Sequence, residues 1–137
     1  MELEQVVRAN DVALRHGLPA ICLSTSQATL AGISHHDGHK QMFASQVAAL
    51  GQHTDVLVMI SSEGGDDVLL AAAREAQDRD MRIVLLTAET GDELSASLSP
   101  MDIQVSIPAE NSLRAYEMQV LAVHCICDLI DNQLLGQ

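Results

Sequence analysis

Four side chains that commonly bind metal ions fall within five positions of this chain. His35, His36, Asp37 and His39 supply three imidazoles and one carboxylate, which are ligands that zinc prefers. A zinc or nickel ion could be held if three of them converged in one loop. No glutamate follows at the helical spacing of zinc hydrolases, so a solvated polar loop is the favoured interpretation and zinc is the weaker alternative. No other cofactor is implied.

A second candidate site follows an apolar run, in the segment VLVMISSEGGDD at positions 56–67. Hydroxyl side chains and a glycine open its loop: Ser61, Ser62 and Gly64. Backbone N–H groups in such a loop, together with a helix N-terminus, can bind phosphate. Glu63, Asp66 and Asp67 place carboxylates where that phosphate would lie. The pattern therefore favours a turn in which Asp66 or Asp67 caps the next helix, with a phosphate site as the alternative.

Glu117 and His124 form a third set, seven positions apart in the last helical pattern. Seven residues are about two turns, so both side chains lie near one helix face but about 10 Å apart along the axis. General acid–base chemistry by this pair would need a bridging group, because the separation is too long for a direct hydrogen bond. A histidine satisfied at a helix or subunit interface is the favoured interpretation.

Apolar runs alternate with helical patterns along most of the chain, which predicts an α/β fold with a parallel sheet in three layers. The expected strands are 20–23, 55–60, 82–86 and 103–107. The expected helices are 2–16, 39–50, 66–79, 91–98 and a long one over 111–135. We expect one domain over 1–137, with ligands beyond the carboxyl ends of the strands, in the loops 24–39, 61–67 and 87–93.

The last helical segment is apolar on more than one side. One set of residues has 3-4-3-4 spacing, typical of packing against a partner helix: Leu113, Tyr116, Val120, Val123, Cys127, Ile130 and Leu134. A second set covers the neighbouring surface: Met118, Leu121, Ala122, Cys125, Ile126 and Leu129. One side can pack on the chain's own sheet, and the other predicts a homo-oligomer, with an intramolecular cover as the alternative.

Composition narrows the classes of partner. Seven basic and nineteen acidic residues give a formal charge of −12, which disfavours direct binding of nucleic acid and favours a basic protein partner. The single Tyr, single Phe and absent Trp leave few platforms for stacking bases or sugars. Three cysteines in apolar settings, with Cys22 in an expected strand, and no apolar run near eighteen residues predict a cytoplasmic protein that does not span a membrane.

Four stretches of the chain resemble the sugar isomerase (SIS) domain family, in the branch of phosphoheptose isomerases and DnaA initiator-associating DiaA proteins. They are LPAICLST, FASQVAALGQHTDVLVMISSEGG, MRIVLLTAETGDELSASLSPMDIQVSIP and LRAYEMQVLAVHCICDLIDNQLL, within 18–135. The last stretch is more similar to DiaA proteins than to the isomerases. The resemblance implies a flavodoxin-like parallel sheet and a tetramer, which is consistent with the two-sided terminal helix.

Departures from the family pattern bear on catalysis. Residues 1–17, a divergent helical segment, hold no counterpart of the family's first strand and its GNGGSAA-like loop. The STSGNS-like phosphate loop is SSEGGD here, an Asn-Asp pair is His35-His36, and a polar residue and Gln of the final helix are Leu113 and Tyr116. The resemblance aligns His124 with the isomerase's catalytic histidine, but its partners are absent.

These comparisons lead to three hypotheses of function. The first is a non-catalytic homo-oligomeric scaffold that binds the replication initiator DnaA and promotes its assembly, with Leu134 and Leu135 as the apolar anchor that the DiaA resemblance implies. The second is a sedoheptulose 7-phosphate or related phosphosugar isomerase, with His124 and Glu117 as acid or base. Its sugar phosphate would contact Ser61, Ser62, Gly64 and Arg114. The third is a sugar-phosphate sensor that binds without reacting.

Overall fold

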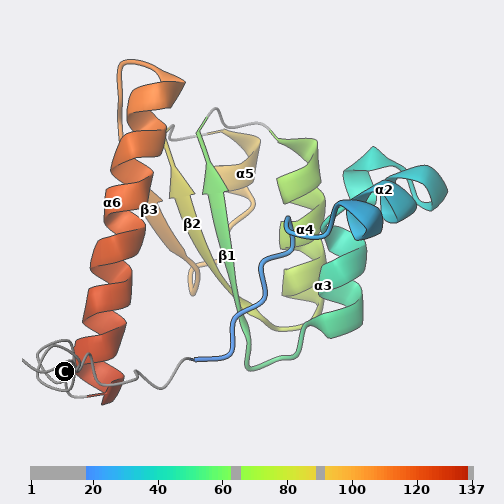
Figure 1. Cartoon of the computed structure of the whole chain (residues 1–137), viewed down its shortest axis with the longest axis horizontal. Helices are drawn as coiled ribbons and strands as arrows, with labels where there is room; N and C mark the ends of the chain where they lie inside the picture. The colour runs from blue at the N-terminus through green and yellow to red at the C-terminus, as the bar shows by residue number, and fades with distance from the viewer. Residues whose placement is uncertain (1–17, 63–65, 89–91, 136–137) are drawn as a thin grey trace, which may run out of the picture.

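The protein is seen in a computed structural model that describes residues 18–62, 66–88 and 92–135, without the side chain of Leu135 (Figure 1). Its sheet is parallel and has the order β1-β2-β3, with strands Val56–Ser61, Arg82–Thr87 and Ile103–Ser106. The predicted parallel α/β sheet is therefore confirmed. The helix expected over 2–16 lies outside the described residues.

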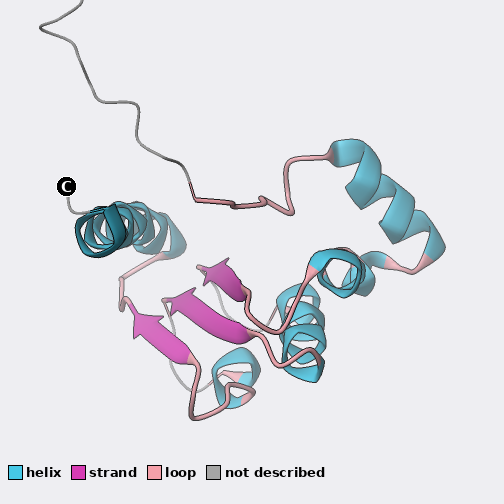
Figure 2. Ribbon diagram, turned by 90° about the horizontal axis from the view of Figure 1, so that it is seen from below, coloured by secondary structure: helices cyan, strands magenta, loops and turns pink. Residues whose placement is uncertain are grey.

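Helices cover both faces of this sheet. The helices of the described chain are α2 (Gln27–His36), the 3-10 helix η1 (His39–Gln41), α3 (Ala44–Leu50), α4 (Asp67–Asp78), α5 (Glu93–Ala96), α6 (Ser112–Ile130) and a final π-helical turn η2 (Asp131–Leu135). Figure 2 shows α4 and α5 on one face and α6 on the other, toward β3. Within the ranges described, no helix is long and apolar enough to cross a bilayer.

The core lies between the sheet and α4. Strand β2 is central and has Ile83, Leu85 and Leu86 fully buried. Helix α4 turns Ala72, Ala73 and Ala76 inward, in addition to larger side chains. Small residues on this face let the helix backbone approach the sheet closely, so the larger side chains of the strands fill the space between the layers.

Two expectations near the start of the described chain are wrong. Residues 20–23 form no strand: residues 20–22 are exposed, Leu23 is half-buried against the core, and a turn begins at Cys22, whose carbonyl accepts a hydrogen bond from Thr25 Oγ1 at 2.9 Å. An extended segment becomes a strand only when a neighbour takes its backbone hydrogen bonds. Helix α2 occupies most of the loop expected over 24–39, and its N-cap is Ser26, whose hydroxyl accepts from Thr29 N.

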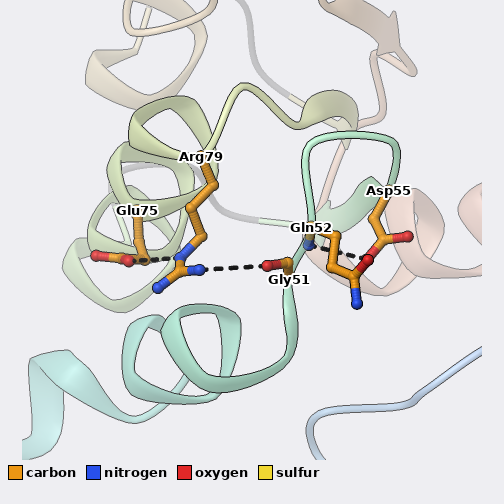
Figure 3. Close-up of polar contacts among 5 residues, drawn as sticks. All are labelled: Gly51, Gln52, Asp55, Glu75 and Arg79. Atoms are coloured by element: carbon orange, nitrogen blue, oxygen red, sulfur yellow. Dashed lines mark hydrogen bonds and ion pairs between the residues drawn. The ribbon is translucent and has the colours of Figure 1, made fainter.

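A tight connection joins α3 to β1 (Figure 3). Arg79, the C-cap of α4, donates to the carbonyl of Gly51 at 3.3 Å and to Glu75 Oε1 at 2.9 Å, while Gln52 N donates to Asp55 Oδ2 at 3.0 Å. Gly51 is the residue of this connection at which a side chain would have too little space. A Cβ there would lie 2.8 Å from the carbonyl oxygen of Val47, which is backbone and cannot move aside.

We expect Gly51→Ala to destabilise the fold by about 1–3 kcal/mol, the usual effect of overpacking a tight site. Gly32→Ala is the matched control, because nothing lies within 4 Å of its Cβ position in α2. Removing a glycine from a helix interior should stabilise by up to about 1 kcal/mol. Urea unfolding midpoints of the two variants measure both effects. Equal midpoints would contradict the close approach at Gly51.

Candidate functional site

Polar side chains gather where β1 and β2 end. Ser61 and Thr87 are the last residues of these strands, they are register partners, and both are buried. The carboxyl ends of parallel strands meet at one edge of a sheet, which is the usual place for a ligand site in this class of fold. Ser62, the next residue, is half-buried. Gly64 lies outside the described residues.

The N-terminus of α4 follows this edge, and carboxylate side chains already lie there. Asp66 is its N-cap, and Asp66 Oδ1 accepts a hydrogen bond from Val68 N at 2.9 Å. This confirms the predicted capping role. Asp67 forms an ion pair with Lys40 of η1, and the hydrogen bond from Lys40 lowers the pKa of the Asp67 carboxyl. A phosphate placed here would meet negative charge in addition to the helix dipole.

Gln119 of α6 ties the terminal helix to the strand ends, a role that was not predicted from the sequence. It is 1% exposed, and its Nε2 donates to the carbonyl of Ser61 at 2.7 Å and to that of Leu86 at 3.5 Å. Its Oε1 is buried and has no hydrogen-bond partner among the described residues. Gln119 follows the fully buried Ala115 by four residues, so both lie on the side of α6 that meets the sheet.

Glu117 and His124 point elsewhere. Successive helical residues are rotated by about 100°, so Glu117 lies about 160° and His124 about 140° around α6 from Gln119. Both are exposed, and Glu117 pairs with Arg114 three residues before it. Within the described chain no hydrogen bond joins His124 to Glu117 or to Ser61. The structure thus unites Ser61, Thr87 and Gln119, and leaves the candidate acid–base pair on the far side of the helix.

The histidines do not form a metal centre in the described part of the chain. His35 and His36 are in the last turn of α2, where their rings meet edge to face with centroids 5.3 Å apart. His39 opens η1, and Asp37 accepts a hydrogen bond from Ser45 Oγ. No group of three or more His, Cys, Asp or Glu side chains there is arranged to hold an ion.

The three cysteines are exposed, which corrects the expectation of apolar settings, and Cys22 is not in a strand. Cys22 Sγ lies 3.3 Å from Ser24 Oγ, and hydrogen bonding from Ser24 lowers the pKa of the thiol. Cys125 and Cys127 lie on α6. Their exposure belongs to a larger apolar surface on that helix.

Apolar side chains are exposed along the whole of α6 and its final turn. They are Leu113, Tyr116, Met118, Val120, Leu121, Leu129, Ile130 and Leu134. Only Ala115 and Gln119 of this helix are fully buried. The candidate anchor Leu134 is 67% exposed, and the side chain of Leu135 is not described. Six members of the 3-4-3-4 set, Cys127 included, are thus exposed, as expected for a surface that packs against a partner helix.

The SIS domain family model matches residues 4–88, more than half of the chain. The chain belongs to the SIS domain family. The match begins within 1–17, the segment in which no counterpart of the family's first loop is found. The strand ends with Ser61 and Thr87 and the N-terminus of α4 fall inside the match, whereas Gln119 of α6 lies beyond it.

This SIS domain is similar to curated proteins of two names. It is 45% identical over 120 residues to the DnaA initiator-associating protein DiaA of Cronobacter sakazakii, which covers 88% of this chain and 61% of the relative. It is 39% identical over 122 residues to the phosphoheptose isomerase of Alkalilimnicola ehrlichii, covering 89% and 62%. The chain therefore spans about three fifths of the length of these relatives.

Solved structures agree with the family assignment. A phosphoheptose isomerase from Francisella tularensis superposes with a TM-score of 0.82 at 38% identity, covering 85% of this chain and 64% of that one. The phosphoheptose isomerase GmhA from Neisseria gonorrhoeae gives 0.81 at 35% identity, covering 83% and 63%. Both the fold and the long terminal helix are thus those of a SIS domain.

Proposed function

We propose that this SIS domain is a non-catalytic, homo-oligomeric scaffold of the DiaA kind, which binds the replication initiator DnaA and promotes its assembly. The observation that carries the proposal is the apolar surface along α6. A row of exposed Leu, Ile, Val and Met side chains on a regular helix is unfavourable in water and is relieved by a second copy. Symmetric oligomers use one such patch on each subunit.

The positions of Glu117 and His124 favour a scaffold over an enzyme. Proton transfer on a sugar phosphate requires a base within hydrogen-bond reach of the substrate and an anchor for its phosphate. In one chain these two residues lie on the opposite side of α6 from Ser61, and Asp66 and Asp67 already occupy the N-terminus of α4. Both requirements are poorly met by the described residues of a single subunit.

The net charge of the protein and the number of binding sites in its oligomer explain how the scaffold would bind DnaA. A net charge of −12 attracts a basic surface of the partner and repels phosphate backbones, so DnaA is bound as a protein without direct contact to nucleic acid. Several copies of the anchor Leu134–Leu135 in one oligomer raise the local concentration of the initiator. We place this assembly in the cytoplasm, where DnaA acts on the chromosome.

A partner-capture experiment tests the anchor. Leu134→Ala should weaken binding of the DnaA N-terminal domain at least tenfold, about 1.4 kcal/mol, because truncating an exposed apolar anchor removes its buried contact in the complex. Leu50→Ala is the matched control, since Leu50 is also an exposed leucine but lies on α3. Light-scattering mass with and without the partner provides the measurement. Equal binding by both variants would reject the anchor, and no mass gain by the unmodified protein would reject the scaffold.

The second candidate is a phosphosugar isomerase, favoured by the phosphoheptose isomerases among the relatives and solved structures. In this hypothesis Glu117, His124 and Arg114 on the outer side of α6 act on a sugar phosphate held by Ser61, Ser62 and Gly64 of a second copy. Turnover of sedoheptulose 7-phosphate that is lost in His124→Ala would establish it. A rise in melting temperature with the sugar phosphate, without turnover, would support a sensor instead.

A further inference from the structure

Strand β3 and helix α6 contribute little to the buried core. The apolar core cluster is formed by α3, β1, α4, β2, α5 and the residue before β2: Val47, Met59, Leu70, Ala72, Ala73, Ala76, Met81, Ile83, Leu85 and Leu94. Within the described chain no residue of β3 or α6 belongs to this cluster, and none of the four residues of β3 is buried. Helix α6 fully buries Ala115 and Gln119 alone. Both elements are therefore attached to a core that other elements build.

A carboxylate holds the start of β3 against β2. Asp102 directly precedes β3; its Oδ1 accepts from Ile83 N at 2.9 Å and its Oδ2 accepts from Ser99 N at 2.8 Å. Pairing of the two strands begins one residue later, at Val84 and Ile103, so the carboxylate takes the place of a strand carbonyl. Burial raises the pKa of the Asp102 carboxyl, but hydrogen bonds from Ser99 and Ile83 outweigh it and the pKa lies below its ordinary value. Both hydrogen bonds are thus made to an ionised group at neutral pH, which strengthens them.

Polar contacts also hold the other end of this part of the chain. Gln119 Nε2 donates to the carbonyls of Ser61 and Leu86, and Ile107 N, just beyond β3, donates to the carbonyl of Thr87 at 2.8 Å. Figure 2 shows α6 toward the β3 end of the sheet, on the face opposite α4 and α5. A hydrogen bond contributes less net stability than burial of a large apolar side chain, because water competes for both of its groups. The attachment of β3 and α6 is therefore mainly polar and is concentrated at the two ends of β2.

We propose that β3 and α6 open from the rest of the protein as one unit, residues 102–130, and that the carboxylate of Asp102 keeps this unit closed. Local opening occurs where few buried apolar contacts must be broken, and it often involves a contiguous supersecondary unit. Strand β3 and α6 follow one another in the chain, so they can leave β2 together. Opening breaks the contact of Gln119 with Ser61 and therefore changes the candidate site and the seat of α6 at the same time.

The turn before β1 provides a matched control, because it has the same local hydrogen bonds as the turn before β3. Gln52 N donates to Asp55 Oδ2 at 3.0 Å, and Asp55 N donates to the carbonyl of Gln52 at 2.9 Å. In the turn before β3, Asp102 N likewise donates to the carbonyl of Ser99 at 3.0 Å. Of the two carboxylates, that of Asp102 also accepts from a strand amide, Ile83 N. A substitution at Asp55 therefore perturbs an equivalent turn without touching the closure of β3.

Hydrogen exchange of the full chain, read by mass spectrometry at neutral pH, tests the proposal. In the parent, protection factors over 103–130 should be lower than those of β1 and α4 by about tenfold or more. Asp102→Asn should lower them by about another tenfold, because an amide cannot accept from both Ile83 N and Ser99 N. Asp55→Asn should change them by less than about twofold. Equal protection of all elements in the parent, or equal effects of the two variants on 103–130, would overturn the proposal.

A second variant, Gln119→Leu, tests whether β3 and α6 open together. It removes the contact with Ser61 at the far end of the unit, so protection should fall by the same factor in β3 as in α6. A fall confined to α6 would show two separate openings and overturn the proposal. Exchange of the parent in low urea needs no substitution: amides of β3 and α6 should converge on one opening free energy below that of global unfolding. Association through α6 is not needed for any of these results, so they do not depend on the proposed function.

Discussion

The double variant Tyr116→Glu/Val120→Glu is expected to weaken association through α6 at least a hundredfold, about 2.7 kcal/mol. Tyr116 and Val120 are neighbours in the 3-4-3-4 set, and both are exposed in the single chain. Association would bury the new carboxylates against an apolar helix without a partner, and unpaired buried charge is strongly unfavourable. Glutamate is a good helix former, so α6 itself should persist.

Sedimentation or light-scattering mass across a dilution series measures this effect. The control variant Gln27→Glu/Ala28→Glu adds acidic groups to exposed positions in the first turn of α2, where the helix dipole favours them. If added negative charge alone caused dissociation, both variants would lose mass. If neither loses mass, the apolar surface of α6 is not the oligomer interface, and the scaffold hypothesis loses its main support.

A second large effect is expected for Gln119→Glu. The substitution can place a carboxylate oxygen where Nε2 now donates to the carbonyl of Ser61 at 2.7 Å, so a hydrogen bond becomes a repulsion in a buried place. At pH 7 the loss in free energy of unfolding cannot exceed the free energy needed to protonate the new glutamate, because the protonated side chain avoids the repulsion. A glutamate in water has a pKa of about 4.3, so this cost is about 2.7 units at about 1.36 kcal/mol each, roughly 3.7 kcal/mol.

The sign of the pH dependence distinguishes this explanation from simple loss of packing. Burial raises the folded-state pKa of the new acid, so the penalty grows as pH rises above the unfolded value and shrinks as pH falls toward about 4. Denaturant unfolding of variant and parent at several pH values would measure it. Gln133→Glu, at an exposed position of η2, should stay within about 0.5 kcal/mol of the parent. A pH-independent loss in Gln119→Glu would contradict the proposed hydrogen bonds.

Much of the fold could be predicted because its signals are local. The runs that became β1, β2 and β3 are short, rich in Val and Ile, and separated by helical periods, and their observed bounds differ from prediction by about one residue. Residues 20–23 have the same apolar character but form no strand, because strand formation depends on a neighbour that a local pattern cannot supply. Helix α2 was missed because its histidines and Gly32 resemble a loop, although Ser26 provided an N-cap signal.

The candidate site was predicted less well, for a different reason. Ser61 and the cap Asp66 follow directly from a strand-to-helix connection, and the structure places both as the pattern predicts. Gln119 is far from Ser61 in sequence, and its role depends on which side of α6 meets the sheet. That choice is made by packing of Ala115 and Gln119 against the strand ends, whereas periodicity alone found several apolar sides and no reason to prefer one.

The order β1-β2-β3 also has a consequence for how the protein is made. Each strand pairs with the next one along the chain, so the sheet can assemble in step with synthesis, which proceeds from the N-terminus. Helix α6, which carries many exposed apolar side chains, follows all three strands in the chain and is therefore synthesised after them. Two nascent chains on one messenger RNA therefore complete their sheets before either presents the helix through which they would associate.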